Sequence, residues 1–144
     1  MKASPLTLFL IFAIAAALIA CIVYLQHKRR LRLLDAAFSG RRPMCCEQFY
    51  DRYFKHKGIA FDIVEGVLDI LQTHLSADLS RLADSDDFSK NLSFLWDFDS
   101  MADVEIVCAL ERKFKIEITN REAENVHTLA DLVELVHGKL AGQC

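Results

Sequence analysis

Glycine and proline are scarce in this chain, at 5 and 2 of 144 residues, so collagen-like and proline-rich architectures are excluded. The five cysteines are odd in number and show no Cys-x-x-Cys spacing, which argues against a disulfide scaffold and a zinc ribbon. The sequence also lacks the His-Glu-x-x-His, Gly-x-Ser-x-Gly and P-loop motifs of common enzyme classes. With 53% hydrophobic and 26% charged residues, the composition is that of a folded protein.

Charged residues are missing from positions 3–26, and positions 5–24 are almost wholly apolar. Twenty helical residues at about 1.5 Å each span the roughly 30 Å hydrocarbon core of a bilayer. Basic residues cluster directly after this run, at 28–32, whereas only Lys2 precedes it. The positive-inside rule therefore predicts an uncleaved, single-pass anchor with the C-terminal part in the cytoplasm.

The alternatives to an uncleaved anchor are a cleaved signal peptide and a lipoprotein. A cleaved signal peptide has a shorter apolar region and a basic segment before it, which does not match this chain. Residues 18–21, Leu-Ile-Ala-Cys, are similar to a lipoprotein box with Cys21 as the lipidated residue, which would place the domain in the periplasm. The apolar run continues past Cys21 to Leu25, which favours the anchor.

The charge is divided sharply along the chain. Residues 1–57 carry ten Lys or Arg and three Asp or Glu, and residues 58–144 carry seven and seventeen. This division predicts a transmembrane anchor at 1–26, a basic and aromatic juxtamembrane linker at 27–57, and an acidic domain at 58–144. The linker either lies on membrane lipid, with Cys45 and Cys46 as acylation sites, or packs its aromatic residues on the domain. The acidic domain argues against a nucleic-acid partner.

Apolar residues in the domain recur at helical spacing. The pattern predicts helices over about 58–75 and 100–114, a short helical turn near 120–125, and a last helix that starts at Thr128 and frays near Gly138. Residues 76–99 are expected to form a long loop whose acidic run at 84–87 is solvated. The predicted fold class is all-α: a small helical bundle of three main helices and a short one, behind one transmembrane helix.

The residues from 99 onward resemble the acyl carrier proteins. The resemblance covers about forty residues without a gap and rests on Asp-Ser-Met at 99–101, Val-Glu-Ile-Val at 104–107, Ala-Leu-Glu at 109–111 and Glu-Ala-Glu at 122–124. It implies that a phosphopantetheinyl transferase attaches 4′-phosphopantetheine to Ser100, with Asp99, Met101 and Asp103 beside the attachment point. It also implies that the chain is no enzyme, and that it presents an acyl group to acyltransferase or synthase enzymes. The resemblance and the short anchor together predict a bacterial inner membrane.

The chemistry of the residues around Ser100 is compatible with this role. A serine at the start of a helix lies near free backbone N–H groups that favour a phosphate. The spacing Ser100-x-x-Asp103 is equally a capping box with a purely structural role. Aliphatic residues on facing helices are candidates for lining an acyl-chain groove: Leu71, Val104, Val107 and Val133.

The sequence departs from the family pattern in two places. Six residues, 93–98, lie between Leu92 and Asp99, which places Phe94 and Trp96 near the base of an arm on Ser100. The helix that follows Ser100 ends in basic residues, whereas the family's second helix is acidic. Dedicated partner enzymes are therefore expected, which dock on a set of residues along this helix and the insertion: Trp96, Val104, Glu105, Glu111 and Arg112.

Two functions from different classes follow from the sequence. The first is a membrane-anchored acyl carrier protein that presents a tethered acyl group to lipid, fatty-acid or polyketide-type biosynthetic enzymes. The second is a membrane adaptor with a carrier-like fold, which acts by protein–protein interaction and carries no arm.

Overall fold

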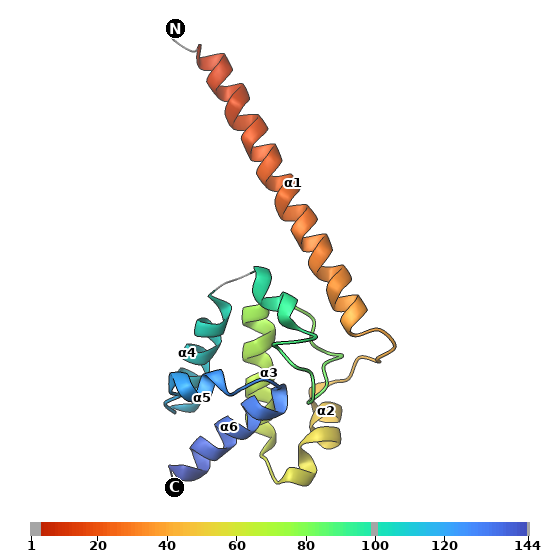
Figure 1. Ribbon diagram of the computed structural model, residues 1–144, viewed down its shortest axis with the longest axis vertical. Helices are drawn as coiled ribbons and strands as arrows, with labels where there is room; N and C mark the ends of the chain where they lie inside the picture. Colours follow the sequence, from red (N-terminus) through yellow and green to blue (C-terminus); the bar gives the residue numbers. More distant parts are fainter. Residues whose placement is uncertain (1–3, 99–100, 144) are drawn as a thin grey trace. The chain divides into compact units, whose positions relative to one another are not determined.

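The computed structural model describes residues 4–98 and 101–143, which form six α-helices and two 3-10 helices (Figure 1). No β-strand occurs in these two ranges, so the predicted all-α fold class is confirmed. The chain divides into two compact units, residues 1–36 and residues 37–144. The predicted domain boundaries after residues 26 and 57 stay predictions.

The first unit contains all but the last residue of the helix α1, Pro5–Ala37, whose most apolar stretch has no buried residue. By length and composition this helix is able to cross a membrane. It continues well past the apolar run and includes the basic residues at 28–32. The helix is longer than the hydrophobic pattern because Leu, Ala and Arg are good helix formers, and neither glycine nor proline occurs between Thr7 and Phe38.

The second unit is built around α3, Phe61–Leu75. This helix packs against α2 (Cys46–Tyr53), α4 (Ala102–Phe114) and α6 (Leu129–Gly142), and Figure 1 shows it between α4 and α2. The buried residues of α3 recur at spacings of three and four, as predicted: Ile63, Val64, Val67, Ile70, Leu71 and Leu75. The short helix α5, Asn120–Glu124, connects α4 to α6.

Gly66 marks the place where α3 and α4 approach closely. A Cβ atom at this position would lie 2.7 Å from Cζ of Phe114 and 3.0 Å from Cε of Lys113. By helix propensity alone, a glycine at this position only weakens the helix. The packing gives the reason for it, because a larger residue at this position would displace the Phe114 ring.

The last helix starts where the sequence predicts and ends later. The Thr128 side chain accepts a hydrogen bond from the Asp131 N–H, and the Asp131 carboxylate accepts one from the Thr128 N–H, which together form a capping box. The expected fraying at Gly138 is wrong, because α6 continues through it to Gly142. Val136 before it and Leu140 after it keep the same apolar spacing, so the packed face extends beyond the glycine.

The aromatic residues of segment 45–61 pack inside the second unit. Phe49 and Phe54 are buried, and their ring centroids lie 5.7 Å apart. The Tyr50 hydroxyl donates to the Ile59 carbonyl at 2.8 Å, and its ring meets Phe61 edge-on. Of the two alternatives for these aromatics, the structure supports packing on the domain.

Candidate functional site

The two residues at the centre of the predicted site, Asp99 and Ser100, lie outside the described residues. The description resumes at Met101, the N-cap residue of α4. The side chain of Asp103 accepts a hydrogen bond from the Val104 N–H at 2.8 Å. The first turn of α4 therefore begins two residues after Ser100, where main-chain N–H groups have no intrahelical acceptor.

A groove of about 690 Å³ runs beside α4. Of the four aliphatic residues expected to line it, the structure brings Leu71, Val104 and Val107 together there. Val133 is fully buried in the core and is not part of the lining, so that expectation is wrong. Asp103, from the first turn of α4, lines the same groove.

Sequence reasoning missed most of the groove's other apolar residues. They come from the loop before α4, the segment after it, and α6: Phe88, Ile118, Val126, Leu132 and Leu135. No single periodic pattern joins residues from three separate segments, so only the tertiary fold brings them together. The groove is of the size and apolar character of small-molecule sites.

One of the polar groups that line the groove is already hydrogen-bonded within the protein. An oxygen of the Glu111 carboxylate accepts a hydrogen bond from the Ile118 N–H at 2.8 Å, which fixes the chain after α4. The deeper lining is aliphatic or aromatic, while Asp103 and Glu124 are exposed. These features fit an alkyl chain on a flexible arm: Val104, Val107 and Leu71 would contact the chain, and the first turn of α4 would lie beside the phosphate.

The outer face of α4 carries the other predicted docking residues. Met101 and Val104 are unusually exposed for apolar side chains, at 56% and 51%. Glu105 lies 3.4 Å from Nδ1 of His74, and Arg112 is exposed with its Nε donating to the Cys108 carbonyl. Glu111 is half-buried and occupied by Ile118, so it is less available to a partner than the sequence suggested.

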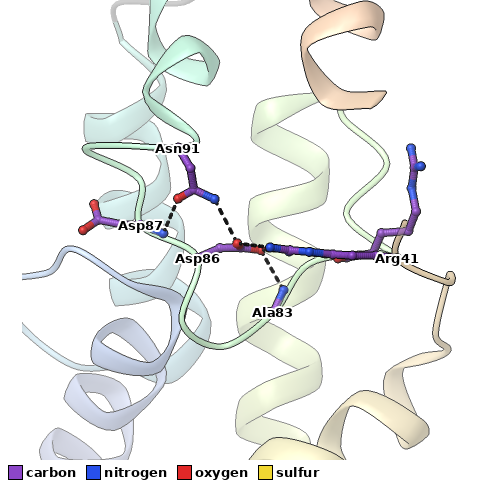
Figure 2. Close-up of polar contacts among 6 residues, drawn as sticks. Arg41, Ala83, Asp86, Asp87 and Asn91 are labelled. Atoms are coloured by element: carbon purple, nitrogen blue, oxygen red, sulfur yellow. Dashed lines mark hydrogen bonds and ion pairs between the residues drawn. The ribbon is translucent and has the colours of Figure 1, made fainter. Parts of the chain in front are cut away.

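The loop before α4 is held together by a buried carboxylate rather than solvated. Asp86 is 3% exposed and accepts two hydrogen bonds from the Arg41 guanidinium, at 2.6 and 2.9 Å (Figure 2). It also accepts from the Ala83 N–H and from the Asn91 side chain. The expectation of a solvated acidic run is therefore wrong for Asp86, because Arg41, 45 residues earlier, supplies its counter-charge.

These contacts change the acidity of the loop carboxylates. Burial raises the pKa of Asp86, but the hydrogen bonds from Arg41, Ala83 and Asn91 outweigh it and hold the pKa below its usual value. The Ser89 hydroxyl and N–H, with Lys90, lower the pKa of Asp87 to about 2. Both groups therefore stay ionised at neutral pH.

The inserted residues form the 3-10 helix η2, Ser93–Phe98, and bring Trp96 to the groove. The indole Nε1 donates to the Phe88 carbonyl at 2.9 Å, and the two rings meet edge-on. Trp96 is half-buried and lines the groove with Asp103. Its expected closeness to an arm on Ser100 stays a prediction, because Ser100 lies outside the described residues. Phe94, the other inserted aromatic singled out from the sequence, does not line it.

Comparison with known proteins places this architecture in a family. Residues 65–136 match the family described as "Phosphopantetheine attachment site". The acyl carrier protein of Thermosynechococcus vestitus is 32% identical over 80 residues, which are 56% of this chain and 94% of the relative. That of Caulobacter vibrioides is 36% identical over 80 residues, 56% of this chain and 97% of the relative.

The matched region contains α4, α5 and most of α3 and α6, whereas α1 and α2 lie before it. The match therefore covers the helices that build the groove and the stretch that holds Ser100. The sequence match shows that the chain belongs to the acyl carrier proteins, whose members carry 4′-phosphopantetheine as a covalent cofactor, and the all-helical fold with its groove beside α4 agrees with this.

Proposed function

We propose that this chain is a membrane-anchored acyl carrier protein that holds its acyl group on Ser100, at the cytoplasmic face of the membrane. The family match over residues 65–136 carries the proposal, because it includes Ser100 and every residue that lines the groove. The arm supplies a terminal thiol, which binds the acyl group as a thioester. The groove residues shelter the alkyl part of that group from water.

The anchor gives the carrier its place of action. The helix α1 is long and apolar enough to cross a bilayer, and the basic residues at 28–32 follow its apolar run. Tethering confines the carrier to a thin layer beside the membrane, which raises its effective concentration for membrane-bound enzymes. Acyl groups for lipid, fatty-acid or polyketide-type synthesis are the cargo we expect.

The exposed face of α4 is the docking surface that we propose for those enzymes. It has apolar side chains at Met101 and Val104, acidic ones at Asp103 and Glu105, and Arg112 near its end. A partner with an apolar centre, a basic patch toward Asp103 and an acidic patch toward Arg112 would be complementary. Phosphopantetheinyl transferase and acyl-handling enzymes are the expected partners.

The test is the intact mass of the full chain purified from its own membranes, with fragmentation around Ser100. We expect the mass of one phosphopantetheine on Ser100, with any cargo as a further increment. Ser100→Ala should abolish the increment, whereas the matched control Ser93→Ala, at an exposed inserted residue, should keep it. An unmodified serine in cells with a competent transferase would contradict the carrier function and support the adaptor.

A further inference from the structure

One wall of the groove is aromatic and comes from the loop before α4 rather than from the bundle helices. Phe88 and Trp96, which we call the aromatic wall, both line the groove, with ring centroids 5.9 Å apart. Because the indole N–H is bound to the Phe88 carbonyl, the Trp96 ring is fixed against Phe88 instead of turning into solvent.

The aromatic wall is fastened to the last helix through Phe88. The Phe88 N–H donates to the His127 carbonyl at 2.8 Å, and the Ala130 N–H donates to the Asp84 carbonyl at 3.0 Å. These bonds join the loop to the residues at the start of α6. The wall is therefore held at one end by the bundle itself.

The other support of the aromatic wall is the buried cluster around Asp86. The Arg41 guanidinium donates to the Asp86 carboxylate, which also accepts a hydrogen bond from the Asn91 amide group. The Asn91 side-chain oxygen in turn accepts a hydrogen bond from the Asp87 N–H at 2.8 Å (Figure 2). Asp87 directly precedes Phe88, so three linked residues, Asp86, Asn91 and Asp87, connect Arg41 to the wall. In the sequence, Arg41 comes four residues after the end of α1 at Ala37.

We propose that the aromatic wall determines which acyl chains the groove holds, and that Arg41 is a positioning residue that keeps the wall in place. This inference rests on the proposed function, because the acyl chain reaches the groove on the arm. A straight alkyl chain lies flat along fixed rings, whereas a methyl branch collides with them. The favoured cargo is therefore an unbranched acyl chain long enough to reach Trp96.

Trp96 is the single tryptophan of the chain, so its fluorescence reports on the wall without labelling. The full chain in lipid nanodiscs is loaded by a phosphopantetheinyl transferase from dodecanoyl- or acetyl-coenzyme A. We expect the dodecanoyl form to shift the emission to shorter wavelength and to resist iodide quenching about twofold more than the acetyl form, because only the long chain covers the ring.

The outcomes separate the two proposals. Identical tryptophan emission from the dodecanoyl and acetyl forms would overturn the role proposed for the aromatic wall, but it would not contradict the carrier function. Failure of both coenzyme A thioesters to load Ser100 would overturn both proposals.

Selectivity is measured as the rate at which hydroxylamine cleaves a branched thioester, 3,7-dimethyloctanoyl, relative to the straight decanoyl thioester. In the unaltered protein the branched chain should be cleaved faster, because the groove shelters it less. Trp96→Ala should reduce this ratio about fivefold. This is a small effect beside the selectivity that a closed pocket shows for one methylene group, because the groove is open. An unchanged ratio would overturn the proposal.

Arg41→Gln should move the ratio in the same direction by about twofold, and Arg41→Lys should restore part of it, since lysine keeps the charge but loses the two-pronged contact. Arg42→Gln is the matched control, because it removes an equal charge from the exposed neighbouring residue. If Arg41 served stability alone, Arg41→Gln would lower the melting temperature without changing the ratio, and that result would overturn its positioning role.

Discussion

At the scale of single residues, Asp86 is the strongest example of a side chain whose role depends on distant partners. Its carboxylate is buried and accepts hydrogen bonds from Arg41, Ala83 and Asn91. A buried carboxylate without these partners would be costly, so the loop and Arg41 depend on each other. Phe38 adds to this junction, since its buried ring lies under the guanidinium groups of Arg41 and Arg81.

The first prediction concerns the stability contributed by this cluster. Asp86→Ala should lower the free energy of unfolding by about 2–4 kcal/mol, because it leaves the Ala83 N–H and the Asn91 amide without an acceptor. Ser85→Ala, at the exposed neighbouring residue, should stay within about 0.5 kcal/mol. Urea unfolding of the full chain in detergent, followed by circular dichroism, measures both. Equal effects of the two substitutions would contradict the role assigned to Asp86.

The second prediction is the pH dependence of the same cluster. The pKa of Asp86 is lowered in the folded state, so its ionised form stabilises the fold above the unfolded-state pKa of about 3.9. That contribution is lost as the pH falls through the lowered, folded-state pKa. Asp87, whose pKa is about 2, acts in the same direction. Between pH 5 and pH 2, Asp86→Asn should therefore lose less stability than the unaltered protein, which urea titrations at fixed pH values would measure.

At the scale of elements, two glycines in the interior of helices, Gly66 and Gly138, have opposite surroundings. Gly66 in α3 lies against Phe114 of α4, whereas a Cβ at Gly138 in α6 would meet no atom within 4 Å. The first glycine is required by helix packing. The second only weakens a helix that packs well on both sides of it.

The third prediction follows from this contrast. Gly138→Ala should stabilise the domain by about 0.5–1 kcal/mol, because alanine has the higher helix propensity and displaces no neighbour. Gly66→Leu should destabilise it by about 1–3 kcal/mol, because the added side chain must push the Phe114 ring aside. Thermal unfolding of the full chain measures both changes. A stabilising Gly66→Leu would show that the α3–α4 contact is looser than described.

At the scale of the whole molecule, the chain combines an apolar helix with an acidic helical unit that contains the groove. The basic residues at 28–32 fall between them in the sequence. Under the proposed function they remain on the cytoplasmic side, where phosphopantetheinyl transferase and coenzyme A are present. The proposed topology and the proposed modification therefore depend on each other.

The fourth prediction tests this topology. In a variant without the five native cysteines, Ser4→Cys should react with a membrane-impermeant maleimide in intact cells. A cysteine retained only at position 108, which is exposed on the second unit, should react only after the inner membrane is opened. Labelling of position 108 in intact cells with the inner membrane closed would contradict a cytoplasmic carrier domain.

The sequence by itself determined the anchor helix and the four helices that follow α2, because each depends on local spacing and capping. It did not predict α2 or η2. The apolar run of α1, the stripe of α3 and the Thr128 cap of α6 are all readable within a few turns of chain. The family was readable too, because the run from Asp99 to the Glu-Ala-Glu turn keeps its register without a gap.

Only the tertiary structure decided where the groove lies and what holds its wall. Phe88, Trp96 and Leu132 meet in one groove although they come from different segments, and Val133 faces the core one residue away from Leu132. The Arg41–Asp86 pair joins residues 45 positions apart. Hydrophobic periodicity reports which side of an element is buried but not which element buries it, so contacts of this range leave no local signal.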